Sequence, residues 1–231
     1  MRPSLKVVLG FLAFSTVSFA QILNMGIPDA FQVTYVANLN VSQTNPALDS
    51  FINISNSGAS IDFAESLLEE VALPGNHKRG PSKPHSILVS EGVGSICANI
   101  YAFDASEELL SCCSCVVTPG ALAPIGISTS LLSNTATGEK PSSAVIKIVS
   151  TLDFGGCDPT NIDPFFLVSG MLGTRTTLHA TTPGSFALTE SPFVQSELSQ
   201  GELDHLTTFC AFISANGAGG GVCTGCPTSN I

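Results

Sequence analysis

The sequence predicts an all-β-dominated fold: an antiparallel β-sandwich with a C-terminal α-helix and a short inserted helix, stapled by disulfides. Three observations predict it. Short segments of alternating apolar and polar residues recur along the chain, with turn residues between them. All eight cysteines follow a stretch typical of an export signal. A capped amphipathic helix precedes the last two cysteines.

The first 20 residues have the pattern of a secretory signal peptide. Arg2 and Lys6 precede a short apolar core, and Ser18 and Ala20 are the small residues that favour cleavage after Ala20. The apolar run is shorter than the ~20 residues that a spanning helix needs. We therefore predict a secreted, periplasmic or cell-exterior protein, with residues 21–231 as a single disulfide-linked domain and no membrane span after signal removal.

The chain is acidic, which bears on its partners. Its formal net charge is −10, and it becomes −12 without Arg2 and Lys6 of the signal. Such a surface repels nucleic acid and anionic membranes, so neither is an expected partner. The absence of Trp and the presence of only two Tyr also disfavour a carbohydrate platform.

The N-terminal part of the domain predicts two strands, over residues 31–41 and 51–54, because apolar and polar residues alternate there. Residues 62–73 change to a three- and four-residue apolar spacing, which predicts a short amphipathic helix. This helix and the basic loop after it form a predicted insertion over residues 60–95.

Residues 96–118 predict a β-hairpin that holds four of the eight cysteines on two apolar arms around an acidic turn. Symmetric folding about the turn sets Cys97 opposite Cys115 and Asn99 opposite Cys113. This register places one group of cysteines on one face, Cys97, Cys113 and Cys115, and leaves Cys112 on the other.

Further strands are expected between the hairpin and the final helix, over residues 125–132, 143–151, 165–172, 175–180 and 186–189. Gly173 separates the third and fourth of these. The final helix begins at a capping box formed by Ser199 and Glu202 and ends at Asn216 and Gly217. One apolar stripe runs along it, made of Leu203, Leu206, Cys210 and Ile213.

The cysteines are the candidate site residues, all expected in disulfides: Cys97, Cys112, Cys113, Cys115, Cys157, Cys210, Cys223 and Cys226. Sequence does not choose among their pairings. Cys112 and Cys113 point to opposite faces of a strand, so we expect them to bond elsewhere than to each other, and at least one to reach beyond the hairpin. Cys210 with Cys223 or Cys226 is a plausible local bridge.

Other chemistries are weaker. The Cys-Cys-x-Cys and Cys-x-x-Cys clusters have the ligands for a four-thiolate zinc site or a redox dithiol. A glycan-active enzyme needs two converging carboxylates, which sequence spacing does not show. Asp104, Glu107 and Glu108 make a weak calcium loop. His179 is a candidate base without a nucleophile motif, and His205 is expected at the boundary of the helix's apolar stripe.

Several segments carry a resemblance: CANIYAFD with ELLSCCSCVVTP, then AVIKIVST, TTLHA and ELDHLTTFCAFISANGAGGGVCTGC. Through them the chain resembles a family of uncharacterised exported, cysteine-rich bacterial proteins of the acidobacterial type, for which no activity is assigned. The likeness spans residues 51–57 and 96–226, so residues 60–95 read as an insertion. The chain departs from the family at Gly219 and Gly220, near which other members carry a bulkier residue. The resemblance implies export and disulfides and brings no catalytic residue.

The sequence therefore favours an exported structural or interaction protein that is not an enzyme, with an unknown protein or cell-surface partner. It assigns no catalytic, cofactor-binding or metal-binding residue. A thiol-based zinc or redox module and a carboxylate-dependent glycan-active enzyme are the alternatives.

Overall fold

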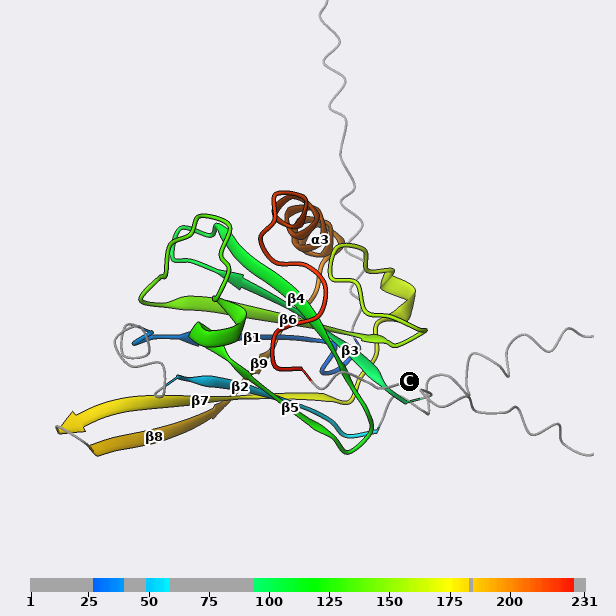
Figure 1. Cartoon of the computed structure of the whole chain (residues 1–231). Helices are drawn as coiled ribbons and strands as arrows, with labels where there is room; N and C mark the ends of the chain where they lie inside the picture. The colour runs from blue at the N-terminus through cyan, green and yellow to red at the C-terminus, as the bar shows by residue number, and fades with distance from the viewer. Residues whose placement is uncertain (1–26, 40–48, 59–93, 183–184, 227–231) are drawn as a thin grey trace, which may run out of the picture.

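The computed structural model describes residues 27–39, 49–58, 94–182 and 185–226. The predicted signal peptide, the inserted helix over residues 62–73 and nearly all of the insertion lie outside these residues. The described strands form two antiparallel sheets with the order β4-β3-β6-β1-β9 and β5-β2-β7-β8. The predicted β-sandwich with a C-terminal helix is confirmed (Figure 1).

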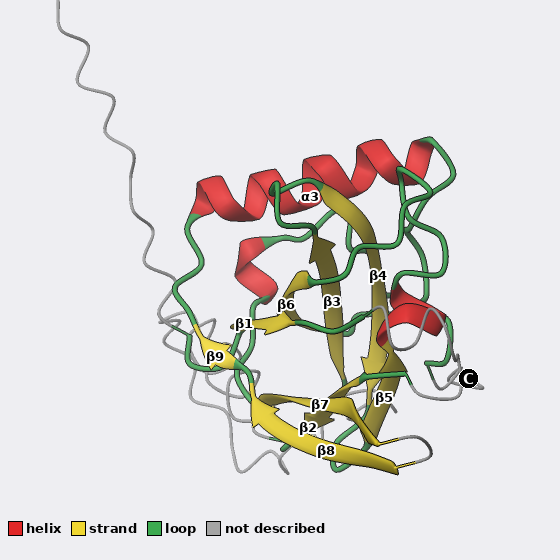
Figure 2. Cartoon of the chain, turned by 90° about the vertical axis from the view of Figure 1, so that its left-hand side faces the viewer, coloured by secondary structure: helices red, strands yellow, loops and turns green. Residues whose placement is uncertain are grey.

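The five-stranded sheet lies closer to the C-terminal helix. It contains β1 (Phe31–Val36), β3 (Ile96–Phe103), β4 (Leu109–Val117), β6 (Ala144–Leu152) and β9 (Val194–Gln195). Helix α3 (Gln200–Ala215) packs on the outer face of this sheet, on the side away from the second sheet (Figure 2). Because both faces of the hairpin strand β3 are covered, all eight of its residues are buried.

The second sheet contains β2 (Phe51–Asn56), β5 (Leu122–Gly126), β7 (Met171–Thr182) and β8 (Ser185–Pro192). A branched aliphatic core fills the space between the sheets, with fully buried Ile52, Ile54, Ile100, Ile125, Ile146 and Ile148. A second cluster lies under α3, where Leu203, Leu206 and Ile213 meet Tyr101, Phe103 and Val149. Both clusters are apolar because each lies between two packed layers, the first between the two sheets and the second between α3 and the five-stranded sheet.

Two strand predictions need correction. The segment expected as a strand over residues 125–132 leaves the sheet after Gly126 and forms a π-helical turn, η2 (Ile127–Leu131). The buried Asp49 carboxylate causes this, since it accepts hydrogen bonds from the backbone N–H of Ser128 at 3.0 Å and of Thr129 at 2.8 Å. These bonds favour a helical turn over a continued strand.

Gly173 does not separate two strands. It lies inside β7, and residues 164–166 instead form a 3₁₀ turn, η3 (Pro164–Phe166). Gly173 is there because of a close contact: a Cβ at this position would lie 2.9 Å from the Phe193 ring and 3.0 Å from Gln32 Oε1. Strand β8 is longer than the expected 186–189, and β9 is an element that the sequence pattern did not predict.

The predicted hairpin forms, but its register is one residue away from the expected one. Ala98 lies opposite Cys115, Asn99 opposite Ser114, and Tyr101 opposite Cys112. An irregularity between Ala102 and Phe103 shifts the pairing near the turn, so symmetric folding about Ser106 does not continue along the arms. Cys97 therefore shares its face with Cys112, not with Cys113 and Cys115.

The helix prediction is confirmed at both ends. Ser199 Oγ accepts a hydrogen bond from the Glu202 N–H at 3.1 Å, which is half of the predicted capping box. The Glu202 carboxylate does not complete the box; it pairs with Lys147 Nζ of β6 at 2.6 Å and ties the helix start to the sheet. Gly217, at φ 85°, ends the helix. Among the described residues, no helix has the length and apolarity to cross a membrane.

Candidate functional site

The hairpin cysteines all bond outside the hairpin. The four bridges are Cys97–Cys157, Cys112–Cys210, Cys113–Cys223 and Cys115–Cys226. The expectation that Cys112 or Cys113 reaches beyond the hairpin is confirmed, and the expected local bridge from Cys210 to the tail is wrong. Cys210 lies on the buried stripe of α3, directly over the outer face of β4, where Cys112 points; their Cα atoms are 5.8 Å apart.

The face of the sheet decides each partner. Cys112 points to the outer face and belongs to the cluster under α3. Cys113 and Cys115 point to the inner face and belong to the core between the sheets, together with Cys223. Adjacent residues of a strand alternate in direction, so one short stretch of β4 is linked both to the helix and to the C-terminal tail.

The tail itself is held along the edge of β4. Ser114 N donates to Gly221 O at 2.9 Å, Cys223 N donates to Ser114 O at 3.0 Å, and Gly220 N donates to Cys112 O at 2.6 Å. Ser114 and Val222 form a parallel bridge. The tail thus covers backbone groups of an edge strand that would otherwise lack a strand partner.

Glycine is required where the tail meets β4. Gly219 has φ 70°, and a Cβ there would lie 2.8 Å from Cys112 N and 2.9 Å from Cys112 O. Gly220 has φ 78°, and its Cβ would lie 2.5 Å from Ser214 Oγ. A side chain at either position would therefore combine backbone strain with a steric clash.

Four sulfur atoms gather where the tail crosses β4. The Sγ atoms of Cys115, Cys223 and Cys226 all lie within 4.8 Å of one another, and Cys113 is bonded to Cys223. Cys115 is fully buried, Cys223 and Cys113 are 3% and 6% exposed, and Cys226 is partly exposed. The cluster is therefore open to solvent mainly at Cys226.

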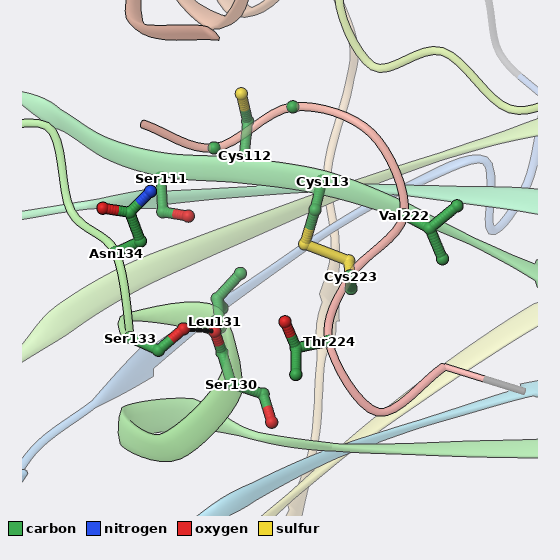
Figure 3. Close-up of a pocket in the computed structure, with 12 residues that line it drawn as sticks. Ser111, Cys112, Cys113, Ser130, Leu131, Ser133, Asn134, Val222, Cys223 and Thr224 are labelled. Carbon is green, nitrogen blue, oxygen red and sulfur yellow. Dashed lines mark hydrogen bonds between the residues drawn. A yellow bond between two sulfur atoms is a disulfide. The ribbon is translucent and has the colours of Figure 1, made fainter. Parts of the chain in front are cut away.

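A small pocket of about 130 Å³ adjoins this cluster (Figure 3). It lies between β4, the segment after β5 and the tail, and the Cys113–Cys223 bond forms part of its wall. The remaining polar lining consists of hydroxyl and amide side chains, from Ser111, Ser130, Ser133, Asn134 and Thr224. Among the described residues, those that line this pocket include no carboxylate and no imidazole.

A second, larger pocket of about 310 Å³ lies between the β3–β4 turn, β6 and the start of α3. Its lining includes the carboxylates of Asp104, Glu107 and Glu202. The sequence analysis did not predict that Glu202 lies near the other two. Two of these carboxylates are already engaged. Asp104 Oδ1 accepts from the Ser106 and Glu108 N–H groups at 2.8 and 2.9 Å, and Glu202 pairs with Lys147. The acidic turn is thus stabilised by hydrogen bonds from its own backbone to Asp104.

The histidines singled out by sequence occupy separate places. His179 lies on β7 opposite Ala187 of β8, so β8 offers it no acidic partner there. His205 lies at the edge of the α3 stripe, as predicted, with its ring in edge contact with Phe209 at a centroid distance of 4.4 Å.

Sequence reasoning missed Tyr101. Its side chain is fully buried under α3, and its hydroxyl donates to Pro159 O at 2.7 Å. Burial, and secondarily the negative charge of Asp158, raises the pKa of the Tyr101 phenol far above its usual value. The pattern of a buried aromatic on the hairpin was visible, but its partner 58 residues away was not.

Comparison with known proteins gives a brief result. The chain matches no family model, no curated protein and no solved structure. The resemblance to exported acidobacterial-type proteins thus stays a prediction, and function has to be argued from this structure.

Proposed function

We propose that the protein is an exported, non-enzymatic interaction protein that binds an extended segment of a partner protein along the edge of β8. The signal-like N-terminus and the four disulfides support export. The observation that carries the interaction is the character of β8, a long exposed edge strand on a rigid, cross-linked body.

Strand β8 differs from the other three sheet edges. The tail covers the edge strand β4, and β9 at the opposite edge has only two residues. In the second sheet, β5 contains Pro124, which has no N–H to offer. By contrast, β8 has eight residues and pairs, among the described residues, only with β7.

The side chains of β8 suit an added strand. Leu188 and Phe186 are 59% and 46% exposed, although they lie opposite Leu178 and Ala180 of β7. The strand contains no Lys; its one charged residue, Glu190, lies opposite Thr176, and its proline, Pro192, is the last residue of the strand. In Figure 1 the β7–β8 hairpin reaches beyond the other described strands. Backbone pairing supplies affinity in such a complex, and alternate side chains supply specificity.

The test combines cross-linking with matched edge variants. A photo-cross-linking residue at Leu188 in the full chain, expressed in its source cells, identifies the partner, and binding of the purified partner is then measured. We expect Leu188→Lys to weaken binding at least about tenfold, because a Lys at the edge blocks strand addition. The control is Leu122→Lys on β5, where the native side chain is 56% exposed, and it should leave binding unchanged.

Two outcomes contradict the proposal. Equal binding by the Leu188→Lys and wild-type proteins would remove β8 as the surface. Hydrolysis of a glycan by the purified protein, with activity lost in Glu202→Gln, would favour the enzyme alternative at the acidic pocket.

A further inference from the structure

Two adjacent disulfides, Cys113–Cys223 and Cys115–Cys226, bring four sulfur atoms together where the tail meets β4. The sequence contains two clusters, Cys112 to Cys115 and Cys223 to Cys226. The structure separates them by face: Cys112 turns outward to Cys210, while the other four sulfurs gather on the inner side of β4. We propose that, when these four are reduced, they bind one Zn²⁺ through Cys113, Cys115, Cys223 and Cys226. This goes beyond the proposed function.

Three of the four sulfurs lie near one another on the scale of a tetrahedral thiolate site. A Zn–S distance of about 2.3 Å places the sulfurs of such a site about 3.8 Å apart. The sulfurs of Cys115, Cys223 and Cys226 already lie within 4.8 Å of one another. Cys113, which is bonded to Cys223, becomes the fourth ligand once that bond is reduced.

The backbone holds both halves of the site. Cys113 and Cys115 are two residues apart on one strand and therefore project to the same side. Cys223 and Cys226 flank a tight turn, in which Cys226 N donates to Cys223 O at 3.1 Å and Gly225 has φ 92°. Cys223 and Cys226 have the Cys-x-x-Cys spacing typical of structural zinc sites, whereas Cys113 and Cys115 are one residue closer together.

The two halves do not need disulfides to stay together. The tail is bound to β4 by the backbone hydrogen bonds at Cys112 and Ser114 described above, none of which involves a sulfur atom. Three of the four cysteines are almost fully buried. The Thr224 hydroxyl points toward the Cys113–Cys223 bond in the adjoining pocket, where it can donate to a thiolate (Figure 3).

The two states of the cluster exclude each other. Each disulfide takes two electrons and two protons from an external dithiol, which becomes a disulfide in turn, and leaves two thiols. Zinc then binds the four deprotonated sulfurs and releases their protons. An oxidising compartment therefore favours the two disulfides, and the metal form belongs to the reduced chain.

The first experiment uses two four-cysteine variants, reduced with a phosphine and titrated with Co²⁺. One has Ser at 97, 112, 157 and 210 and keeps the tail set; the other has Ser at 113, 115, 223 and 226. We expect the first to bind one Co²⁺ with the absorption of tetrahedral thiolate coordination, and Zn²⁺ to displace it. The second should bind at least about tenfold more weakly. Equal binding by both, or no binding by the first, overturns the proposal.

The second experiment uses the reduced wild-type chain, since a variant with four substitutions can fail to fold. The protein is alkylated with and without one equivalent of Zn²⁺, and the modified cysteines are mapped. We expect zinc to lower the alkylation of Cys113, Cys115, Cys223 and Cys226 and to leave the alkylation of the other four unchanged. Protection spread evenly over all eight, as an unfolded chain would give, or centred on Cys97 and Cys157, overturns the proposal.

Discussion

Cys112 and Cys113 are neighbours on β4 that bond to opposite sides of the sheet. Cys112 reaches Cys210 of α3, and Cys113 reaches Cys223 of the tail, with Cα–Cα distances of 5.8 and 4.9 Å. One dipeptide therefore connects three parts of the fold. Because each bridge closes a loop of about a hundred residues, each restricts the unfolded chain strongly.

Removing the Cys112–Cys210 disulfide should destabilise the protein but leave α3 folded. We expect Cys112→Ala with Cys210→Ala to lower the free energy of unfolding by about 2–4 kcal/mol. The helix should persist, because Leu203, Leu206 and Ile213 still pack on the sheet. Denaturant unfolding and circular dichroism measure the two effects. An unchanged midpoint, or loss of helix signal in the folded variant, contradicts this account.

The glycines of the tail provide a matched pair. Gly219→Ala should cost on the order of 2–4 kcal/mol, because strain at positive φ adds to a clash with the Cys112 backbone. Gly221→Ala has a similar φ of 66° but no atom within 4 Å of the new Cβ, so it should cost only about 1–2 kcal/mol. Denaturant unfolding under non-reducing conditions compares them. Equal losses would show that the close approach to β4 has no energetic effect.

Tyr101 should make the fold sensitive to alkali. Its pKa is raised by burial in the folded state, whereas an unfolded tyrosine ionises near pH 10. The folded state thus keeps a proton that the unfolded state loses, so stability is present below about pH 10 and falls above it, by up to about 1.4 kcal/mol per pH unit.

The measurement uses the phenolate absorbance of Tyr35→Phe, which leaves Tyr101 as the one tyrosine of the chain. Its absorbance should rise only together with unfolding. Tyr101→Phe should remove this contribution to the alkaline loss, while leaving the Pro159 carbonyl without its donor at a cost of about 1–3 kcal/mol. Ionisation of Tyr101 in the still-folded protein would contradict the prediction.

The start of α3 should depend on its cap. We expect Ser199→Ala to lower the free energy of unfolding by about 0.5–2 kcal/mol, because the Glu202 N–H loses its acceptor. Ser142→Ala, at an exposed position outside any strand or helix, is the control and should change little. Thermal or denaturant unfolding compares them, and equal effects would argue against the cap.

Local patterns predicted much of the fold. The β-branched residues over 143–151 and the cap and stop signals around α3 each correspond to an observed element. Local patterns failed where a distant group acted: Asp49 turned the predicted strand into η2, and the space beside Phe193 and Gln32 required Gly173 inside β7. Asp49 is far in sequence from η2, and Phe193 and Gln32 are far from Gly173. A local sequence pattern therefore does not contain these contacts.

For the cysteine cluster too, some features follow from the sequence and others only from the tertiary structure. The sequence by itself determined that eight cysteines are present, that Cys112 and Cys113 point to opposite faces, and that a capped helix presents Cys210 on its apolar stripe, because side-chain direction follows from the strand and helix periods. Only the tertiary structure decided the pairing and the gathering of four sulfurs. Both depend on an irregularity at Ala102 that shifts the hairpin by one residue, and on the tail lying along β4. A one-residue shift in register moves the side chains of one strand to the opposite face of the sheet relative to its neighbour. Which cysteines then bond depends on which segments lie next to that face.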